Sequence, residues 1–229
     1  MKTPRSIVLL PLLAVTLLAC AAGRMALREG ERIVFFGDSI TELGVKPNGY
    51  VTLIREAIMA RHPNTLIEVI GAGVSGNKVP DLQQRLVRDV MNRKPAIVVI
   101  YIGINDVWHW ELKNLKGTTK EDYESGLREM IARMQYAGAN VILCTPSVIG
   151  EKTDSSNGQD TMLEEYAAIS RAVARSLGTT LCDLRKAFHD YLVLNNKENK
   201  RQGILTYDGV HLNDEGNKLV AREILKYLE

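Results

Sequence analysis

Apolar segments of strand length alternate with segments of helical periodicity along this chain, from Ile33 to its end. This alternation predicts a parallel sheet covered by helices on both faces, because parallel neighbours are joined by crossovers of helix length. We therefore expect an α/β protein, a three-layer α/β/α sandwich around a parallel five-stranded sheet. The predicted strands span residues 32–36, 66–70, 97–102, 141–145 and 180–182, and the predicted helices span 50–61, 81–92, 120–136, 162–177 and 214–227.

Composition limits the classes of partner. The 229 residues are 45% hydrophobic, which is enough for one substantial core. The 29 lysines and arginines nearly balance the 27 aspartates and glutamates, and no long basic run follows the first residues, which argues against nucleic acid as a partner. No Cys-x-x-Cys motif or Cys/His cluster indicates a metal. We expect no metal, no cofactor and no obligate protein partner.

The N-terminal segment differs from the rest of the chain. Lys2 and Arg5 precede a mostly apolar run that ends at Cys20, which is the pattern of an export signal rather than of a folded element. The run Leu17-Leu18-Ala19-Cys20 resembles the lipobox of bacterial lipoproteins. That resemblance implies cleavage before Cys20, acylation of its thiol and attachment to a membrane surface.

Two alternatives for this segment stay open: a secretory signal cleaved without lipidation, and an uncleaved anchor, for which the run is short. We expect residues 1–20 to be a signal peptide, 21–30 a short tether and 31–229 the catalytic domain. The protein is then exported from a bacterial cytoplasm. A membrane-anchored lipoprotein is the favoured form, and a periplasmic or secreted protein is the alternative.

Four short motifs carry the residues that are most able to take part in catalysis. Three of them follow predicted strands and one precedes the last predicted helix. Since open α/β sheets bind ligands at the carboxyl ends of their strands, all four can meet at one edge. The motifs are Gly37-Asp38-Ser39-Ile40, Gly73-Val74-Ser75-Gly76-Asn77, Gly103-Ile104-Asn105-Asp106 and Asp208-Gly209-Val210-His211.

Together these motifs hold the parts of a serine hydrolase. Ser39 becomes a nucleophile when a base takes its proton. Asp208 and His211 are three residues apart, so the aspartate can orient the imidazole that serves as base. The backbone N–H groups of Ser39 and Gly76 and the side-chain amide of Asn105 are candidate oxyanion donors. Each motif alone is also typical of an ordinary surface turn.

The order and spacing of the four motifs resemble the SGNH branch of the GDSL esterase/lipase family, over roughly residues 32–228. The resemblance implies the flavodoxin-like SGNH hydrolase fold, with Ser39 as nucleophile, Gly76 and Asn105 as oxyanion donors, His211 as base and Asp208 as its partner. Two departures are visible in the sequence. Ile40 replaces the leucine of the family name, and Gly71 stands where many relatives have asparagine.

A competing motif overlaps the second block. Residues 71–76 fit G-x-G-x-x-G, follow a predicted strand and precede a helix, as a dinucleotide fingerprint would. However, the motif follows the second strand, and no acidic residue ends the next strand about 20 residues on. A nucleotide site would also leave Ser39, Asn105 and the Asp208/His211 pair without a purpose.

Several further residues are candidates for substrate contact or for structure. Asp38, Trp108 and Trp110 are candidate substrate-binding residues, with packing beneath the loop as the alternative for either tryptophan. Asp38 is also a candidate for holding its own turn. The polar stretch 151–159 predicts a flexible loop that could form part of the substrate rim. Cys144 and Cys182 are expected as buried free thiols, and a disulfide between them would need neighbouring strands in register.

The motifs thus predict a metal-independent serine esterase that works through a Ser-His-Asp triad and an acyl-enzyme. We expect short acyl groups, acetyl first, on small-molecule or carbohydrate esters. The alternatives are a lysophospholipase or thioesterase acting on longer chains, an O-acyltransferase that passes the acyl group to a glycan, and a non-catalytic glycan-binding protein on the same fold.

Overall fold

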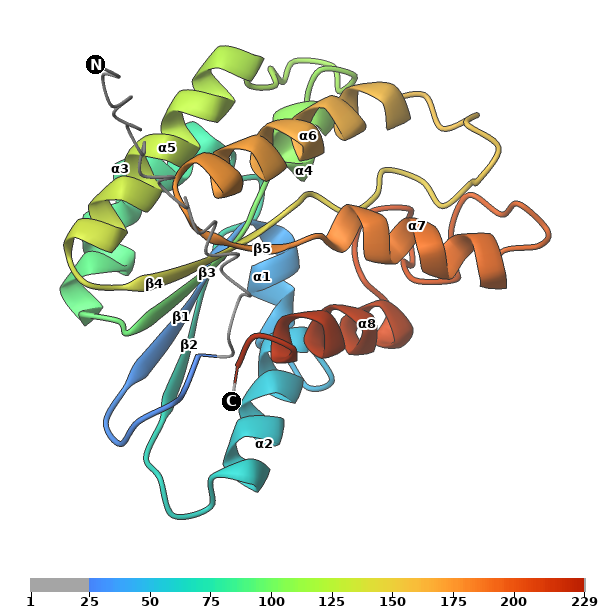
Figure 1. The fold of residues 1–229 in the computed structure, drawn as a ribbon. Coiled ribbons are helices and arrows are strands. Elements are labelled where there is room, and N and C mark those ends of the chain that lie inside the picture. The colour runs from blue at the N-terminus through green and yellow to red at the C-terminus, as the bar shows by residue number, and fades with distance from the viewer. Residues whose placement is uncertain (1–24, 229) are drawn as a thin grey trace, which may run out of the picture.

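The computed structural model describes residues 25–228, which form a three-layer α/β/α sandwich (Figure 1). Its five-stranded sheet has the order β2-β1-β3-β4-β5, and every neighbouring pair is parallel. The predicted α/β sandwich is confirmed. The strands are β1 (Arg32–Gly37), β2 (Glu68–Gly73), β3 (Ile97–Tyr101), β4 (Asn140–Cys144) and β5 (Thr180–Cys182).

Helices cover both faces of the sheet (Figure 1). Contacts join α3 to α5 and α5 to α6 on one face, and α1 to α2, α2 to α8 and α7 to α8 on the other. The helices are α1 (Ser39–Gly44), α2 (Tyr50–Arg61), α3 (Val79–Asp89), α4 (Ile104–Trp108), α5 (Lys120–Tyr136), α6 (Asp160–Ser176), α7 (Leu184–Asn195) and α8 (Asp214–Leu225), with a short 3-10 turn at Met91–Arg93.

Local sequence explains where several helices begin. The side chains of Thr119, Asp183 and Asn213 each accept a backbone N–H in the first turn of α5, α7 and α8, which satisfies a donor that the helix cannot pair internally. The predicted bounds of α2 and α5 agree with the structure. Prediction missed α1, α4 and α7, and it placed the start of α3 at residue 81 instead of Val79.

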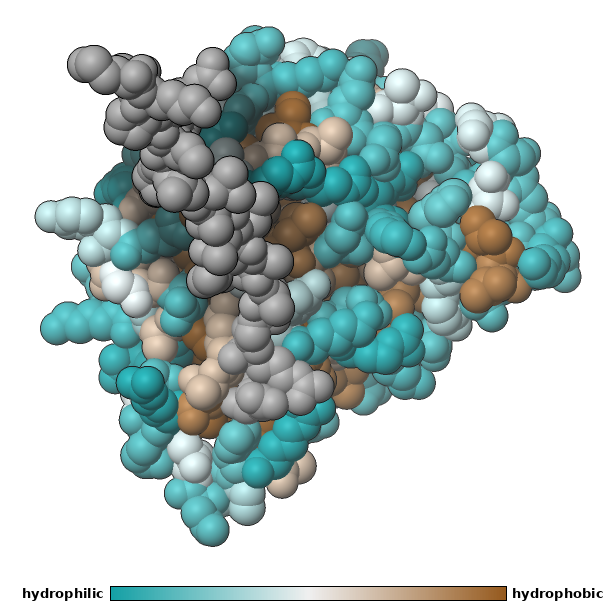
Figure 2. Space-filling model, viewed as in Figure 1, coloured by the Kyte–Doolittle hydropathy of each residue, from teal (hydrophilic) through white to brown (hydrophobic). Residues whose placement is uncertain are grey.

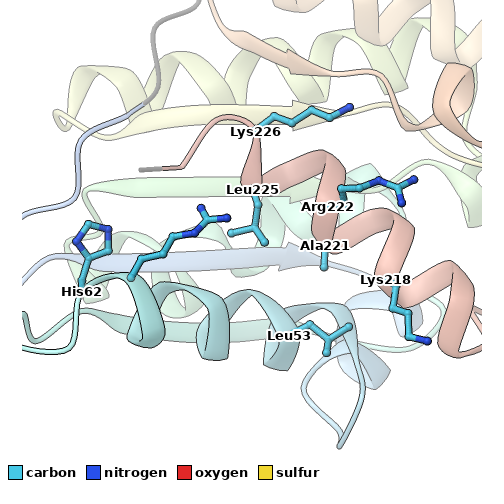
Figure 3. Close-up of a pocket in the computed structure, with 8 residues that line it drawn as sticks. Leu53, His62, Lys218, Ala221, Arg222, Leu225 and Lys226 are labelled. Carbon is cyan, nitrogen blue, oxygen red and sulfur yellow. The ribbon is translucent and has the colours of Figure 1, made fainter.

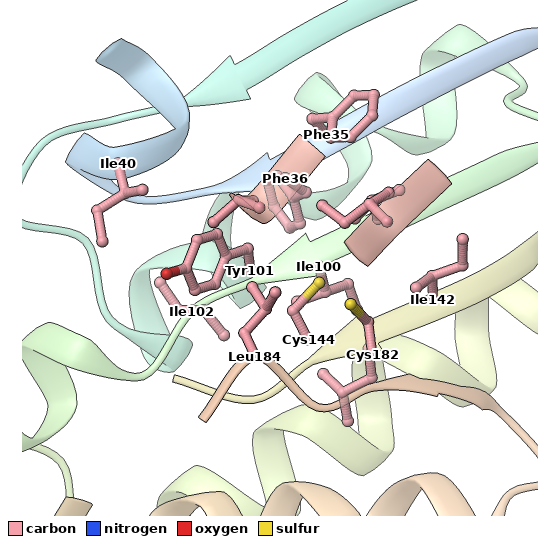
Figure 4. Close-up of a cluster of buried hydrophobic side chains, with 14 of the residues drawn as sticks. Phe35, Phe36, Ile40, Ile100, Tyr101, Ile102, Ile142, Cys144, Cys182 and Leu184 are labelled. Carbon is pink, nitrogen blue, oxygen red and sulfur yellow. The ribbon is translucent and has the colours of Figure 1, made fainter. Parts of the chain in front are cut away.

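The core lies between the sheet and its helices. Figure 4 shows Phe35, Phe36, Ile100 and Tyr101 in one cluster of buried side chains with both cysteines of the sheet. Cys144 and Cys182 are register partners on β4 and β5, and both are buried free thiols. The prediction of buried free thiols is confirmed, although the register that a disulfide would need is present.

The N-terminal predictions fall mostly outside the described residues. The predicted signal peptide, with Cys20, lies there. Within the predicted tether, the N–H of Met25 donates to the carbonyl of Tyr227 (2.9 Å) and that of Gly30 to Leu66 (2.8 Å), so residues 25–30 pack on the domain. None of the described helices is both long and apolar enough to cross a bilayer. Where Figure 2 shows described residues, that face is mostly hydrophilic.

The first two glycines of the G-x-G-x-x-G motif have a packing role. Gly71 and Gly73 lie inside β2 rather than in a phosphate-binding turn. A Cβ at Gly73 would lie 2.1 Å from the backbone nitrogen of Glu42, and one at Gly71 would lie 2.2 Å from the Val45 side chain. Both glycines therefore let α1 and the turn after it pack directly on β2.

Replacing Gly73 with alanine should lower the free energy of unfolding by about 2–3 kcal/mol, because the new methyl group meets the backbone of α1. Urea unfolding measures this. Gly138→Ala is the control: a Cβ there meets no atom within 4 Å and only the positive φ of 87° opposes it, which costs about 1 kcal/mol. A G73A variant as stable as wild type would contradict the packing of α1 on β2.

Candidate active site

Strand register brings three of the four motifs to the same edge of the sheet. Gly37 at the end of β1 pairs with Gly73 on β2 and with Tyr101 on β3. The loops that follow these strands therefore leave the sheet at one level, and they carry Ser39, Gly76 and Asn105 a few residues later. The fourth motif lies just before α8, whose first residue is Asp214.

A chain of hydrogen bonds joins Ser39 to the fourth motif. The Oγ of Ser39 lies 2.9 Å from Nε2 of His211. On the other side of the imidazole, Nδ1 lies 2.7 Å from Oδ2 of Asp208. The structure thus brings together a hydroxyl, an imidazole and a carboxylate that sequence analysis expected to meet, across a separation of 172 residues.

Asp208 is fixed by its own turn. Its Oδ1 accepts the backbone N–H groups of Val210 (2.9 Å) and His211 (2.7 Å), so the carboxylate cannot rotate away without losing three donors. Partial burial alone would raise the pKa of Asp208, but the bonds from the His211 side chain and from the two backbone amides lower it overall. The charged form is therefore favoured beside the imidazole.

Two aromatic rings flank the imidazole. Tyr207 stacks on His211 with ring centroids 5.7 Å apart and an interplanar angle of 13°, and Trp108 meets it edge-on at 6.3 Å. Tyr207 is 55% exposed. Sequence reasoning missed Tyr207, although it directly precedes Asp208. The rings hold the imidazole plane and leave an aromatic surface at the rim of the site.

Trp110 occupies a different position from Trp108. A Cβ at Gly117 would lie 2.3 Å from the Trp110 indole, so this ring packs on the Gly117 backbone, and Trp110 is 41% exposed. His109 between the two tryptophans is buried, and burial lowers its pKa. Of the two predicted substrate-contact tryptophans, the structure brings Trp108 to the imidazole of His211 and places Trp110 against Gly117.

The two other predicted oxyanion donors lie on neighbouring loops. Gly76 has a φ of +77°, and a Cβ there would meet nothing within 4 Å, so the space beside its backbone is open. Asn105 is buried, and its side-chain amide donates to the carbonyl of Asn77 (3.0 Å). An amide has two N–H groups, so one remains for a further acceptor.

A buried arginine, missed by sequence reasoning, holds the Gly76 loop. Arg85 on α3 donates to the carbonyls of Gly37 (2.7 Å) and Ala72 (2.9 Å) and to Oδ1 of Asn77 (2.6 Å). Its guanidinium also lies over Phe36, 4.5 Å from the ring centroid. Because Asn77 in turn accepts from Asn105, Arg85 links the motifs that carry Ser39, Gly76 and Asn105.

A second contact fastens the same loop to α1. The backbone N–H and the hydroxyl of Ser75 both donate to Oε2 of Glu42, at 2.5 and 2.7 Å. These bonds lower the pKa of Glu42. Gly76 is therefore held from two sides, by Glu42 on α1 and, through Asn77, by Arg85 on α3.

A buried carboxylate supports the other half of the site. Glu151 is fully buried, and its carboxylate accepts the N–H groups of Ile204, Leu205 and Thr206 and the hydroxyl of Thr206, at 2.5 to 2.8 Å. These residues lead directly into the turn of Asp208. The predicted flexible rim 151–159 is thus buried at its first residue, Glu151, which anchors the histidine loop, and at its last, Gln159; residues 154–156 are exposed.

Asp38 and Asp106 are buried beneath these loops. Asp38 caps α1 by accepting the N–H of Ile40 (2.9 Å), and Asp106 accepts the N–H of Val79 (3.0 Å). Burial raises the pKa of Asp38 to about 7 and that of Asp106 to about 6. Asp38, a candidate substrate contact, is only 2% exposed, which leaves its carboxylate little surface for a substrate.

Two observations concern ligands. Among residues 25–228, no group of three or more His, Cys, Asp or Glu side chains is arranged to hold a metal ion. A groove of about 650 Å³ between α2 and α8 lies apart from Ser39, and its lining residues include none of the four motifs (Figure 3).

Comparisons with known proteins agree with this geometry. A model of the GDSL-like lipase/acylhydrolase family matches residues 35–219. An acetylxylan esterase of Geobacillus stearothermophilus is 31% identical over 219 residues, which cover 88% of this chain and 95% of the relative. The isoamyl acetate-hydrolyzing esterase 1 homolog of Rattus norvegicus is 26% identical, with 82% and 78% covered. The crystal structure of the acetyl xylan esterase AlAXEase has a TM-score of 0.82 and 44% identity, and the match covers 85% of this chain and 98% of that one.

Replacing Asp38 with asparagine should remove a pH-dependent loss of stability. The folded-state pKa of about 7 lies above the ordinary value of 3.8, so between these limits the folded protein binds more protons and wild-type stability falls as pH rises. The asparagine would keep an acceptor for Ile40 without titrating. The difference in unfolding free energy, D38N minus wild type, should therefore grow by roughly 3 kcal/mol between about pH 4 and pH 7.

Urea unfolding at several pH values measures this difference, with the exposed Asp122→Asn as control for the loss of one charge. If the unfolding free energies of wild type and D38N changed in parallel between about pH 4 and pH 7, Asp38 would already be ionised in the folded protein at low pH, and the prediction would be wrong.

Proposed function

The chain belongs to the GDSL-like lipase/acylhydrolase family, as its four motifs predicted, and from this premise we propose that it removes acetyl groups from carbohydrate esters. It is a carboxylic ester hydrolase. The observation that carries the proposal is the hydrogen-bonded chain from Ser39 through His211 to Asp208, at the edge of the sheet where the other motifs converge.

In the proposed reaction, Ser39 Oγ attacks the acyl carbon while Nε2 of His211 takes the hydroxyl proton. The hydrogen bond of 2.9 Å between these atoms provides the path for that proton. Asp208 holds the imidazole through Nδ1 and stabilises its protonated form. The resulting tetrahedral intermediate carries its negative charge on the former carbonyl oxygen.

We assign stabilisation of this oxyanion to the backbone N–H groups of Ser39 and Gly76 and to the Asn105 amide. The open space at Gly76 and the second N–H of Asn105 support the assignment. The intermediate collapses when His211 returns the proton to the departing alkoxide, which leaves as the alcohol. Water, activated by His211, then attacks the acetyl-serine and releases acetate.

The names of the relatives support both the acyl group and the alcohol that we propose for the ester substrate. The names of the bacterial and rat relatives both specify acetate as the acyl group, but one alcohol is xylan and the other isoamyl alcohol. The two more similar relatives, at 31% and 44% identity, are named for xylan. In the Geobacillus stearothermophilus enzyme, a serine-to-alanine and a histidine-to-alanine variant are described as catalytic mutants, in agreement with the roles proposed for Ser39 and His211.

Hydrolysis of p-nitrophenyl acetate, butyrate and octanoate, beside acetate release from acetylated xylo-oligosaccharides, tests the proposal. We expect acetate to be the preferred acyl group, and Ser39→Ala to lose about 10⁴-fold or more in kcat. Asn105→Ala should lose about 10²–10³-fold. Octanoate turned over faster than acetate would contradict the acyl assignment, and an active S39A would contradict the mechanism. Acetyl recovered on a second sugar instead of as free acetate would indicate a transferase.

Arg85 should act as a positioning residue for the oxyanion donors. In Arg85→Lys the buried cation remains but its fork of donors is lost, so we expect kcat for p-nitrophenyl acetate to fall about 10²-fold with little change in KM. The affinity for a boronic acid, whose serine adduct is tetrahedral, should fall in parallel. Both are measured on the folded variant.

Asp89→Asn is the matched control for Arg85. The Asp89 carboxylate forms an ion pair with Arg85 at 3.0 Å, and its other hydrogen-bond partner among the described residues is Arg88, outside the Gly76 loop. This variant should lose stability and keep kcat within about threefold, since the loop bonds remain. Equal losses of kcat in R85K and D89N would mean that Arg85 supports the fold alone.

A further inference from the structure

A groove on the helical layer formed by α2 and α8, here called the α2–α8 groove, combines an apolar floor with a basic lining (Figure 3). Leu53, Ala221 and Leu225 form the apolar part of its lining. None of its lining residues is acidic. The remaining residues that line it are Arg61, His62, Lys218, Arg222 and Lys226.

The cations of α8 form a stripe. Lys218, Arg222 and Lys226 recur every fourth residue and therefore lie on one side of the helix. Their side chains are 62%, 59% and 55% exposed. Their ion-pair partners on the same helix are Glu215, which is 44% exposed and 3.7 Å from Lys218, and Glu223, which is 18% exposed and shared by Arg222 and Lys226. Two glutamates therefore face three cations, and each cation is itself solvent-exposed, so these pairs bind only weakly. The stripe therefore remains available to a stronger anionic partner.

The groove lies where the described chain begins. The N–H of Met25 donates to the carbonyl of Tyr227, at 2.9 Å, and Met25 forms a bridge with Leu228. Tyr227 directly follows Lys226. Cys20, the residue that the lipobox-like sequence predicts to be acylated, precedes Met25 by five positions, and five residues span at most about 18 Å. A lipid on Cys20 would hold this end of α8 within that distance of a bilayer.

We propose that the α2–α8 groove docks on the anionic surface of a lipid bilayer. Its charge is complementary to acidic phospholipid headgroups, and its apolar floor fits the boundary between headgroups and acyl chains. Each lysine or arginine near such a surface strengthens binding by about fivefold. The groove thereby supplies a second attachment beside a lipid anchor, which alone gives only reversible binding when it is a single acyl chain.

This docking has a consequence for access to the active site. Helix α8 starts three residues after His211 and its 12 residues extend over about 18 Å. The starts of α2 and α8 meet where the N–H of Tyr50 donates to Oδ1 of Asn217, and Arg61, His62 and Lys226 lie at the opposite ends of these two helices. A bilayer held at those ends leaves the edge that carries Ser39 open to dissolved esters rather than to membrane lipids.

The test uses the chain from residue 21 onward, which lacks Cys20 and retains all the strands, helices and core residues that the structure describes. Cosedimentation with phosphatidylcholine vesicles is compared with vesicles that also contain phosphatidylglycerol, at low and high salt. We expect binding only to the anionic vesicles, weakened by salt. The triple variant K218Q/R222Q/K226Q should bind about a hundredfold more weakly and keep wild-type esterase activity.

The control triple K120Q/R128Q/R133Q removes the same charge from α5, on the opposite face of the sheet. Its side chains are 47%, 38% and 42% exposed, and each pairs with a glutamate. This variant should bind like wild type. If both triple variants lost vesicle binding equally, the net charge of the protein would explain the binding, and this result would overturn the proposal. So would equal binding to neutral vesicles, no vesicle binding at low salt, or binding to an acidic polysaccharide without binding to vesicles.

Discussion

The parallel register of β1 between β2 and β3 is the constraint on which the candidate site depends. Gly37 faces Gly73 on one side and Tyr101 on the other, so the three following loops start from one level. A shift of one residue in either pairing would turn the strand's side chains to the opposite faces of the sheet and move the loop by about 3.3 Å. All five side chains of β3, from Ile97 to Tyr101, are buried, so such a shift would disrupt their packing and lower the free energy of unfolding.

Register alone does not hold the loops, and two buried charged residues complete the arrangement. Arg85 donates to two backbone carbonyls and to Asn77 beside the candidate oxyanion donors, and Glu151 accepts from three successive backbone amides in the segment that leads to His211. Buried charges are costly unless their bonding capacity is filled. Here each one fixes a loop that has no regular secondary structure. The hydrogen bond between Ser39 and His211 spans these two separately supported halves.

The sequence predicted the part of this arrangement that leaves a periodic or motif signal. The alternation of five strands with helices, the bounds of α2 and α5 and the convergence of Ser39, Asn105 and His211 follow from such signals. Helices α1 and α4 have 6 and 5 residues, too few to show a helical period. Arg85 and Glu151 were missed for a different reason. Two of the four partners of Arg85 and three of the four of Glu151 are backbone groups, which carry no sequence signature. In the sequence both residues resemble ordinary surface charges.

The separate anchoring of the two loops also affects which acyl group and which alcohol such a site can accept. In the proposed reaction the acyl group lies beside Ser39 and Gly76, where Arg85 and Glu42 fix the loop through buried or charged contacts. The alcohol leaves on the side of His211, where the ring of Tyr207 is 55% exposed. A rigid loop around the acyl group tolerates few acyl groups. An exposed aromatic rim can accept different alcohols when its surface side chains are substituted. The named relatives, which share acetate and differ in the alcohol, show the pattern that this division of roles would produce.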